Sequence, residues 1–327
     1  MTDYGHDLIF GTFITPPSRH PHDVVGLAQL TERAGLDLVT VMDHPYQPEL
    51  LDAWTLLSYL AARTERVRLS GYVLNLPSRP PAVLARSAAS LDLLSSGRVE
   101  LGLGPGDTFA VDAVAASGGA QRTPAQAVTA LGEAIDIIRG IWDASAPGLF
   151  RLDGEHYRIS GTQRGPRPAH DISIWVPAAG PRMRHLAGRK ADGWISGGLW
   201  MTDVPRELAH GNRVIDEAAT ENGRDPSQIR RVFDFAGTSG AGGRGFAHGS
   251  PGQWAEQLLP LAIEHGVSVF ILAGDDPRMI ERWGREAAPA LREAVARERA
   301  DRAGRNSGMK HWRRCRRQRR EPRPHRS

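Results

Sequence analysis

The amino-acid sequence predicts an α/β fold, a parallel (β/α)8 TIM barrel with a small insertion and a basic C-terminal tail. Eight short segments rich in apolar and β-branched residues alternate with eight segments of helical periodicity. No change in composition divides this body into two domains. A doubly wound open sheet is the alternative, but it usually needs fewer repeats. The number of repeats therefore favours the closed barrel.

The expected strands are short apolar runs that end in glycine, proline or polar residues. They are residues 7–14, 37–42, 66–75, 98–104, 172–178, 191–196, 229–237 and 267–274. Because each is followed by a helical segment, consecutive strands are expected to run parallel. Their carboxyl ends then meet at one face of the barrel, where the active sites of such barrels lie.

The expected helices have an apolar face and recognisable ends. They are residues 22–35, 52–64, 80–97, 124–143, 181–189, 204–222, 251–265 and 277–299. Gly35 suits the C-cap of the first helix, and Asp52 suits the N-cap of the second. The third begins with prolines and is closed by Gly97, the usual asymmetry of helix ends.

Three segments fall outside this alternation. Residues 147–168 are expected to form a hairpin and a loop between the fourth helix and the fifth strand. Residues 237–249 contain six glycines, so we expect a mobile loop that acts as a lid over the site. Residues 301–327 contain almost no aliphatic side chains and are expected to be disordered. The predicted domains are therefore a barrel, residues 1–300, and a tail, residues 301–327.

The tail carries most of the positive charge. It has 11 Lys or Arg and 2 Asp or Glu, a net charge of +9, so the overall +4 leaves −5 for residues 1–300. A basic run of this kind attracts phosphate, but no folded nucleic-acid-binding module accompanies it. We therefore expect no nucleic-acid partner.

The composition also bears on the cellular setting. The single cysteine, Cys315, excludes an internal disulfide and a multi-cysteine zinc site. No apolar run has the length that a membrane helix needs, and the N-terminal residues lack the pattern of a secretory signal. These features predict a cytoplasmic protein with no membrane association.

Asp43 and His44 directly follow the second expected strand. At that position the barrel would support both side chains rigidly and direct them toward the site. An imidazole suits proton transfer, because the ordinary pKa of histidine lies near neutrality. The alternative is that Asp43 caps a turn and His44 binds the main chain.

A glycine-rich turn follows the fourth expected strand, in the sequence GLGPGDTF at residues 102–109. Alternate glycines let a ligand approach the main chain closely, and exposed N–H groups favour an anion such as phosphate. Asp107 would place a proton donor beside that ligand. The spacing lacks the third glycine of a dinucleotide fingerprint, and the loop also suits a simple tight turn.

Small residues end the fifth and sixth expected strands, in PAAGP at residues 177–181 and ISGG at residues 195–198. Together with the glycine turn they leave room for an extended, flat, phosphate-bearing ligand. Tyr72, Val73 and Leu74, at the end of the third strand, would provide an apolar bed for its ring system. Close packing of strands and helices is the alternative for each.

These motifs resemble those of the luciferase-like flavin-dependent oxidoreductases, which fold as (β/α)8 barrels. The resemblance extends from residue 5 to about residue 298, and its longest match spans residues 66–107. The Asp-His pair resembles the branch that uses the deazaflavin coenzyme F420. The resemblance implies a cis peptide bond between Tyr72 and Val73, and it implies that homodimers are common.

The resemblance also implies an activity, hydride transfer between bound F420 and a small organic substrate. His44, Asp43 and Asp107 would be catalytic, with Asp43 orienting His44 or binding the coenzyme ring. The residues expected to bind the coenzyme are Asp43, Tyr72, Val73, Asn75, Gly104, Gly106, Asp107, Thr108, Ala178, Ala179, Gly180, Pro181, Ser196 and Gly197. No metal is expected.

Two other functions remain open from the sequence. An FMN-dependent luciferase-like monooxygenase would share the fold and most of the coenzyme contacts. A barrel could also bind a flavin without catalysing a reaction. Asp107 stands where some relatives carry glutamate, and Tyr72 stands where a small residue is common, so the substrate does not follow from the resemblance.

Overall fold

The computed structural model describes residues 2–106, 110–237, 246 and 248–318. Their main sheet has nine strands in the order β3-β2-β1-β11-β10-β9-β8-β5-β4, and all its strand pairs are parallel. The strands are β1 Ile9–Ile14, β2 Leu38–Val41, β3 Arg68–Gly71, β4 Leu74–Asn75, β5 Leu101–Gly104, β8 Ile174–Pro177, β9 Gly193–Ile195, β10 Arg230–Ala236 and β11 Val267–Ala273. Each lies within a predicted strand, which confirms the expected alternation.

The sheet closes into a barrel through its third strand. A cis peptide bond between Tyr72 and Val73 divides this strand into β3 and β4, as expected. β4 pairs with β5, and a parallel bridge joins Leu69 to Val99 just before β5. The nine strands therefore correspond to the eight of a (β/α)8 barrel, which confirms the predicted fold class.

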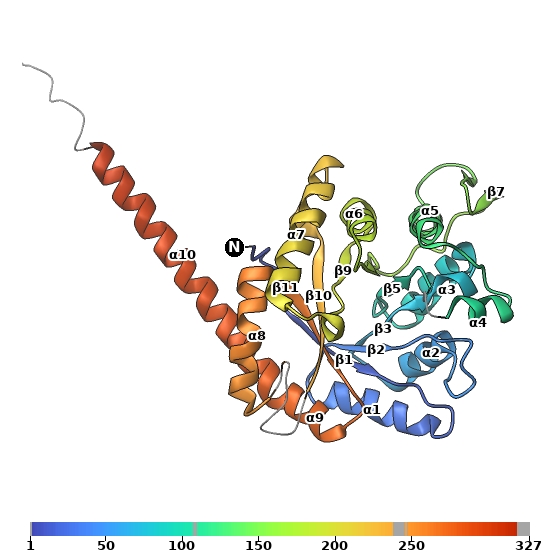
Figure 1. Ribbon diagram of the computed structural model, residues 1–327, viewed down its shortest axis with the longest axis horizontal. Helices are drawn as coiled ribbons and strands as arrows, with labels where there is room; N and C mark the ends of the chain where they lie inside the picture. Colours follow the sequence, from blue (N-terminus) through green and yellow to red (C-terminus); the bar gives the residue numbers. More distant parts are fainter. Residues whose placement is uncertain (1, 107–109, 238–245, 247, 319–327) are drawn as a thin grey trace, which may run out of the picture.

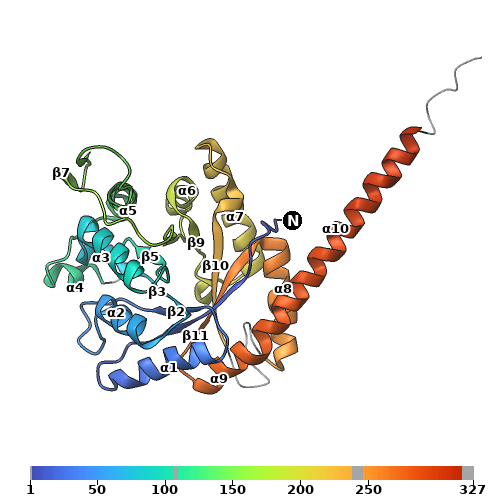
Figure 2. The same ribbon diagram turned by 180° about the vertical axis from the view of Figure 1, so that it is seen from behind.

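Helices surround this barrel in both views (Figures 1 and 2). They are α1 Pro21–Arg33, α2 Ala53–Arg63, α3 Pro81–Leu94, α4 Val111–Ala116, α5 Pro124–Trp142, α6 Pro181–Lys190, α7 Val204–Glu221, α8 Pro251–His265, α9 Pro277–Arg282 and α10 Ala288–Gln318. The short α4 was not predicted. A π-helical turn, Trp283–Ala287, separates α9 from α10, where the sequence predicts one helix.

Side-chain caps explain why several helices begin where they do. The Asp52 carboxylate accepts a hydrogen bond from the Thr55 N–H, as its predicted role requires. Thr123 and Ser250 each form a capping box with a glutamine three residues later. Each cap satisfies N–H groups that have no partner inside the helix.

The apolar core has an inner and an outer layer. Side chains alternate between the two sides of each strand, so every second residue points into the barrel. The inner cluster consists of Ile9, Leu38, Trp175, Ile195, Val232, Val269 and Ile271. Phe13, Tyr72 and Val73 pack against it. The larger outer cluster lies between strands and helices, and together the layers hold the strand ends in fixed positions.

An antiparallel hairpin interrupts the alternation between α5 and β8. Its strands are β6 Phe150–Asp153 and β7 Arg158–Thr162. The carboxylate of Glu133 on α5 accepts hydrogen bonds from the N–H groups of Glu155, His156 and Tyr157 in its turn. The hairpin confirms the insertion predicted for residues 147–168 and is fastened to the barrel.

The C-terminal segment differs from the prediction. Residues 301–318, which were expected to be disordered, continue α10 as helix (Figure 1). The first turns of α10 bury Ala288, Leu291 and Val295. Arginine, alanine, lysine and glutamine favour helix, so a helix that packing has already nucleated continues into the tail. Residues 319–327, like residues 238–245 of the predicted lid, lie outside the described residues.

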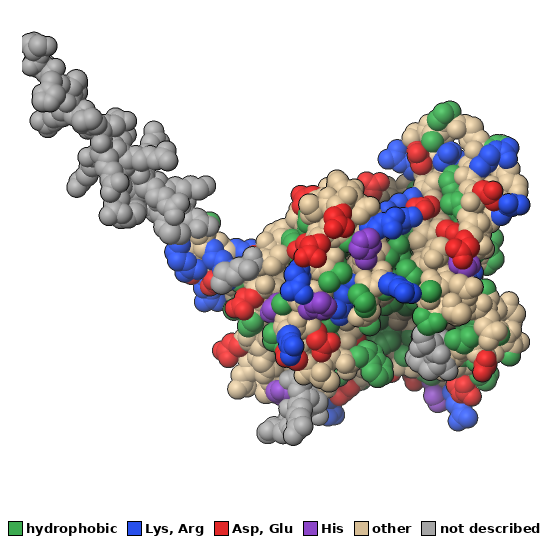
Figure 3. Space-filling view, turned by 45° about the horizontal axis from the view of Figure 1, so that its top comes forward, with side chains coloured by type: hydrophobic (Ala, Val, Ile, Leu, Met, Phe, Trp, Pro, Cys, Tyr) green, Lys and Arg blue, Asp and Glu red, His purple; other side chains and the backbone are tan. Residues whose placement is uncertain are grey.

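Positively charged side chains gather where α10 leaves the barrel (Figure 3). Arg299 donates hydrogen bonds to the Asp3 carboxylate at 2.8 Å, and Arg302 binds Glu298 on its own helix. In the described part of the chain, no helix is both long and apolar enough to cross a membrane.

Candidate active site

A cavity of about 590 Å³ opens at the carboxyl ends of the barrel strands. Its volume lies within the range usual for sites that bind small molecules. The predicted site residues that line it are Asp43, His44, Tyr72, Val73, Asn75, Gly104, Gly106, Ala179, Gly180 and Pro181. The structure therefore brings together the ends of the second, third, fourth and fifth strands of the barrel, as the sequence predicts.

Asp43 is held by an arginine that the sequence did not single out. Arg79 donates to both carboxylate oxygens of Asp43, at 2.9 Å from Nε and 2.8 Å from Nη2. The Asn75 N–H donates to the same carboxylate at 2.9 Å. Arg79 also donates to Asp52, the N-cap of α2, at 2.7 Å. The residues around Arg79 do not indicate this contact, because Arg79 and Asp43 lie 36 positions apart in the sequence.

This geometry shows a structural role for Asp43 besides the expected one. Asp43 is 3% exposed and its two oxygens are engaged by Arg79 and the main chain. Asp43 therefore anchors the chain just after β2, next to His44, while its catalytic or coenzyme-binding role stays a prediction. The pair Asp43–Arg79 is a largely buried ion pair whose carboxylate also accepts a main-chain hydrogen bond, and such additional bonds help a buried pair to be tolerated.

His44 is partly buried at the cavity wall, and its ring is fixed by Tyr46. Nδ1 of His44 lies 2.8 Å from the Tyr46 hydroxyl, and either group can donate, depending on the tautomer. This bond defines the orientation of the imidazole. Tyr46 lies two residues after His44 and contacts the site through this bond, a role that its position in the sequence did not indicate.

Tyr72 extends from the cavity wall toward a buried acid, Asp234 of β10. The Tyr72 hydroxyl is buried and has no hydrogen bond of good geometry among the described residues. Burial, and then the charge of Asp234, raises the pKa of Tyr72 well above its ordinary value. Phe13 packs against the Tyr72 ring at 5.2 Å between ring centroids. Tyr72 thus occupies the space where the barrel interior meets the cavity.

Asp234 is a second acid at this face that the sequence analysis missed. It lies two residues after the inward-facing Val232, so the alternation of β10 directs it into the barrel. The Gly198 N–H donates to its Oδ1 at 2.7 Å. Burial raises the pKa of Asp234, although this hydrogen bond opposes the rise. The pattern VFDFA contained this signal, an acid at an inward position.

Replacing Asp234 by asparagine is expected to stabilise the protein at neutral pH. Because burial raises the folded-state pKa of Asp234, its contribution is fully present below the unfolded pKa, about 4. That contribution is lost as pH rises through the folded pKa. Urea unfolding across this range should show Asp234→Asn more stable than wild type at neutral pH and equal to it in acid. Equal stability at all pH values would contradict the burial argument.

The glycine turn after β5 lies directly against the third strand. A Cβ on Gly104 would lie 2.4 Å from Cγ2 of Val73, and Gly106 has a positive φ of 98°. Glycine is required at both positions, for close packing and for the left-handed conformation respectively. Asp107 and Thr108, predicted to be catalytic or coenzyme-binding, lie outside the described residues.

The start of α6 forms the opposite wall. A Cβ on Gly180 would meet nothing within 4 Å, so this wall has room for a ligand. Ala178, Ser196 and Gly197 do not line the cavity. Ala178 is buried and its carbonyl accepts from the Trp194 indole at 3.0 Å, while the Ser196 hydroxyl donates to the Val232 carbonyl at 2.9 Å. These contacts give Ala178 and Ser196 a packing role.

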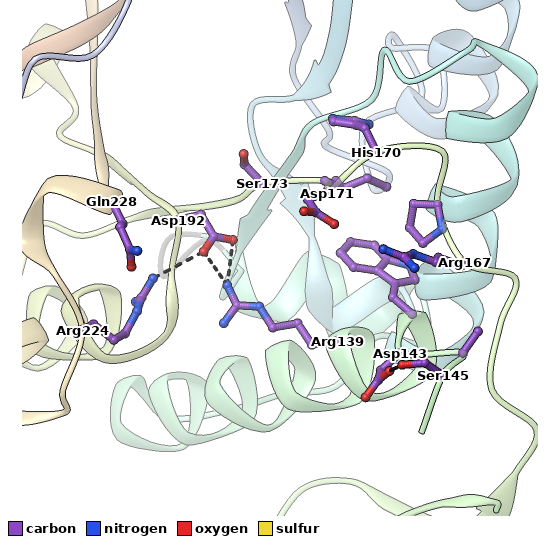
Figure 4. Close-up of a pocket in the computed structure, with 14 residues that line it drawn as sticks. Arg139, Asp143, Ser145, Arg167, His170, Asp171, Ser173, Asp192, Arg224 and Gln228 are labelled. Atoms are coloured by element: carbon purple, nitrogen blue, oxygen red, sulfur yellow. Dashed lines mark hydrogen bonds and ion pairs between the residues drawn. The ribbon is translucent and has the colours of Figure 1, made fainter. Parts of the chain in front are cut away.

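A second cavity, of about 740 Å³, lies at the amino ends of β8, β9 and β10 (Figure 4). Its charged side chains bind one another. The Asp192 carboxylate accepts from Arg139 at 2.7 Å, from Arg224 at 3.4 Å and from the Ile174 N–H at 3.0 Å. The amino-terminal face of such barrels serves stability. We therefore assign the cavity of about 590 Å³, at the carboxyl ends of the strands, as the candidate active site.

In the described part of the chain, no group of three or more His, Cys, Asp or Glu side chains could hold a metal ion.

His170, at the edge of this second cavity, should make stability depend on pH. The Glu100 carboxylate, 3.8 Å from Nε2, and Asp92, 2.9 Å from Nδ1, raise the pKa of His170, although burial opposes them. This stabilisation is complete below the unfolded pKa, about 6.5, and is lost as pH rises through the folded pKa. His170→Gln should cost on the order of 1.5 kcal/mol near pH 5 and less near pH 9. Urea titrations at the two pH values test this, and equal losses would contradict it.

The fold and the cavity define a barrel enzyme whose site lies at the carboxyl ends of the strands. The profile of the luciferase-like monooxygenase family matches residues 9–241. The chain therefore belongs to this family and is an oxidoreductase, which confirms the family expected from the sequence.

Three known proteins illustrate the similarity. An F420-dependent glucose-6-phosphate dehydrogenase of Kribbella flavida is 28% identical over 323 residues, 84% of this chain and 95% of that protein. The structure of an F420-dependent secondary alcohol dehydrogenase has a TM-score of 0.74 at 18% identity, covering 88% of this chain and 99% of the other. An EDTA monooxygenase from Chelativorans sp. BNC1 has a TM-score of 0.73 at 14% identity, covering 88% and 94%. The two structures establish similarity of fold.

Proposed function

We propose that this protein is an F420-dependent oxidoreductase that transfers a hydride between the bound coenzyme and a small organic substrate. The observation that carries the proposal is the placement of His44 in one cavity with the glycine turn at Gly104 and Gly106 and the start of α6 at Gly180. The F420-dependent relatives support the choice of coenzyme. The proposal assigns proton transfer to His44 and coenzyme binding to the other walls.

The residues of the cavity fit a coenzyme with a flat ring and a phosphate-bearing chain. Tyr72 and Val73 offer an apolar surface for the ring, and Asn75 lies beside them. Gly104, Gly106 and the segment 179–181 line the same cavity, and a Cβ on Gly180 would meet nothing within 4 Å, so the start of α6 would have room for the phosphate-bearing chain. When bound, the deazaflavin would supply or accept the hydride.

The protein's own residues would then control one proton. His44 would donate it to the substrate or accept it from the substrate, with its ring oriented by Tyr46. Arg79 would hold Asp43, and with it the end of β2, in place. We propose Asp107 as a second acid, as in the sequence analysis. We also retain the segment 237–249 as a lid that excludes water.

Titration with each coenzyme tests the proposal. Purified protein should bind F420 with a change in the coenzyme's fluorescence, and it should bind FMN much more weakly. The bound F420 should then react with members of a panel of alcohols, ketones and enones. Affinity for F420 with no turnover across the panel would instead indicate a flavin-binding protein without activity.

An FMN-dependent monooxygenase is the second candidate, because the fold is also that of the EDTA monooxygenase. Such an enzyme must protect a reactive oxygen adduct of its flavin, which a deazaflavin does not form. Tight binding of FMN together with no affinity for F420 would select this candidate and overturn our choice of coenzyme.

We also propose that the protein is cytoplasmic and forms a homodimer. A groove of about 640 Å³ runs between α2 and α3, and Leu94 (85% exposed) and Val83 (60%) are apolar side chains that line it. Exposed apolar patches of this kind commonly mark interfaces. The mass in solution should be that of two chains, and Leu94→Glu should shift it toward that of one. A monomeric wild-type protein would contradict the dimer.

A further inference from the structure

A small side cavity of about 110 Å³ lies next to the candidate active site. It shares Pro105, Gly106, Pro124 and Ala127 with the lining of the main cavity. The two cavities therefore lie on either side of the turn that follows β5 and the first turn of α5. A ligand whose ring occupies the main cavity can extend its chain past Gly106 toward the side cavity.

Arg122 is the one charged residue among the described residues that line this side cavity. Its Nη1 is buried, and no described atom accepts a hydrogen bond from it. A buried guanidinium nitrogen without an acceptor is unfavourable, because its N–H groups have lost water without gaining a partner. The structure thus leaves one donor nitrogen of Arg122 without an acceptor beside the candidate active site.

The inserted hairpin holds this guanidinium in place. The carbon at its centre lies 5.1 Å from the centre of the Tyr157 ring, a cation–π contact. Tyr157 lies in the hairpin turn that Glu133 fastens to α5. Burial raises the pKa of Tyr157, and the charge of Arg122 and a hydrogen bond from its side chain oppose that rise. The ring therefore occupies one face of the guanidinium, and Nη1 has no acceptor among the described residues.

The main chain around Arg122 is fixed as well. The Ala120 N–H donates to the Pro77 carbonyl at 3.0 Å, which joins this loop to the segment after β4. Thr123, the next residue, begins α5 with a capping box. Arg122 is therefore anchored on both sides in sequence, and little conformational entropy remains to be lost when it binds a ligand.

We propose that Arg122 forms an oxyanion site for the phosphate-bearing tail of the coenzyme. The inference rests on the proposed function for the identity of the ligand. Guanidinium groups bind phosphate and carboxylate oxygens through two parallel hydrogen bonds, which would satisfy the buried Nη1. Phosphate and a carboxylate of the tail offer the same oxyanion chemistry, so the probes below separate them.

Binding of three probes tests the site. The probes are F420, F420 without its glutamate residues, and the deazaflavin core that lacks the phosphate. Arg122→Gln should weaken the binding of F420 by about 10- to 100-fold and leave the binding of the core unchanged. If phosphate is the anion, Arg122→Gln should weaken the binding of F420 without its glutamate residues as much as the binding of full-length F420. If a glutamate carboxylate is the anion, only full-length F420 should lose affinity.

Arg63→Gln is the matched control. Arg63 is on α2, and its central guanidinium carbon lies 5.7 Å from the centre of the Tyr59 ring, a similar cation–π contact. The control variant should leave all three affinities unchanged. Arg122→Gln could instead weaken the binding of the deazaflavin core as much as the binding of F420, or leave both unchanged. Either result would show that Arg122 only fastens the hairpin and would contradict the oxyanion site.

Binding of FMN and of riboflavin, which lacks the phosphate, shows whether the oxyanion site or the choice of F420 as coenzyme is wrong. If wild type binds FMN but not F420, and Arg122→Gln removes its preference for FMN over riboflavin, the oxyanion site stands while the choice of F420 falls.

Discussion

Replacing His44 by glutamine is expected to lower the turnover number by about 100- to 10,000-fold, the usual contribution of a general acid or base. Glutamine has a similar size and can still form hydrogen bonds, but it cannot take up and release a proton near neutral pH. Because His44 is only partly buried, the substitution should change folding stability little. Steady-state kinetics with the preferred coenzyme and substrate, together with urea unfolding, measure both effects.

The affinity for coenzyme separates a chemical role of His44 from a binding role. If His44 transfers a proton, His44→Gln should leave the dissociation constant of the coenzyme within about threefold of wild type. Tyr46→Phe is the companion variant, since it removes the hydroxyl that lies 2.8 Å from Nδ1 but keeps the imidazole. It should lower turnover less and shift the pH profile. Unchanged turnover in His44→Gln would remove the acid–base assignment.

The barrel could be predicted because its signals are local and repeated. Each strand is marked by a short apolar run, and each helix by its period and its caps, as at Asp52. Once closure is inferred, the residues that follow the strands must meet at one face. His44, Gly104 and Gly180 lie far apart in the sequence, yet their shared cavity follows from this topology alone.

The contacts that complete the site could not be predicted in the same way. Arg79 reaches Asp43 across 36 residues, and nothing in the sequence around it specifies that partner. Asp234 differs, because the alternation along β10 places it inside the barrel, so attention to strand period would have found it. Ala178 and Ser196 do not line the cavity, and their contacts show that small residues after a strand can serve packing as well as a ligand.

The tail shows the limit of composition as a guide. Its lack of aliphatic residues predicts disorder, but composition does not determine whether a helix continues. Propagation adds one hydrogen bond for each residue, whereas nucleation is costly. Because Leu291 and Val295 pack the start of α10 against the barrel, the helix extends to Gln318 without a core of its own.

The second large effect is expected from Arg79→Met, which should destabilise the protein by about 3–5 kcal/mol, the usual consequence of leaving a buried carboxylate without its partner. Asp43 is 3% exposed, so water cannot replace the guanidinium that binds both its oxygens. The end of β2 and the attached His44 should lose their fixed position, and turnover should fall together with stability. Urea unfolding of the protein without coenzyme measures the loss directly.

A second variant distinguishes loss of the ion pair from simple loss of packing. Asp43→Asn combined with Arg79→Met removes both charges, and the introduced amide oxygen can still accept the hydrogen bond from the Asn75 N–H. The double variant should regain most of the lost stability, because replacing both members of a buried pair is often nearly neutral. Arg139→Met is the matched control, since its pair with Asp192 is 39% and 30% exposed and should contribute about 1 kcal/mol or less. A double variant as unstable as Arg79→Met alone would show that the arginine stabilises the end of β2 by packing and by its bond to Asp52, independently of the charge on Asp43.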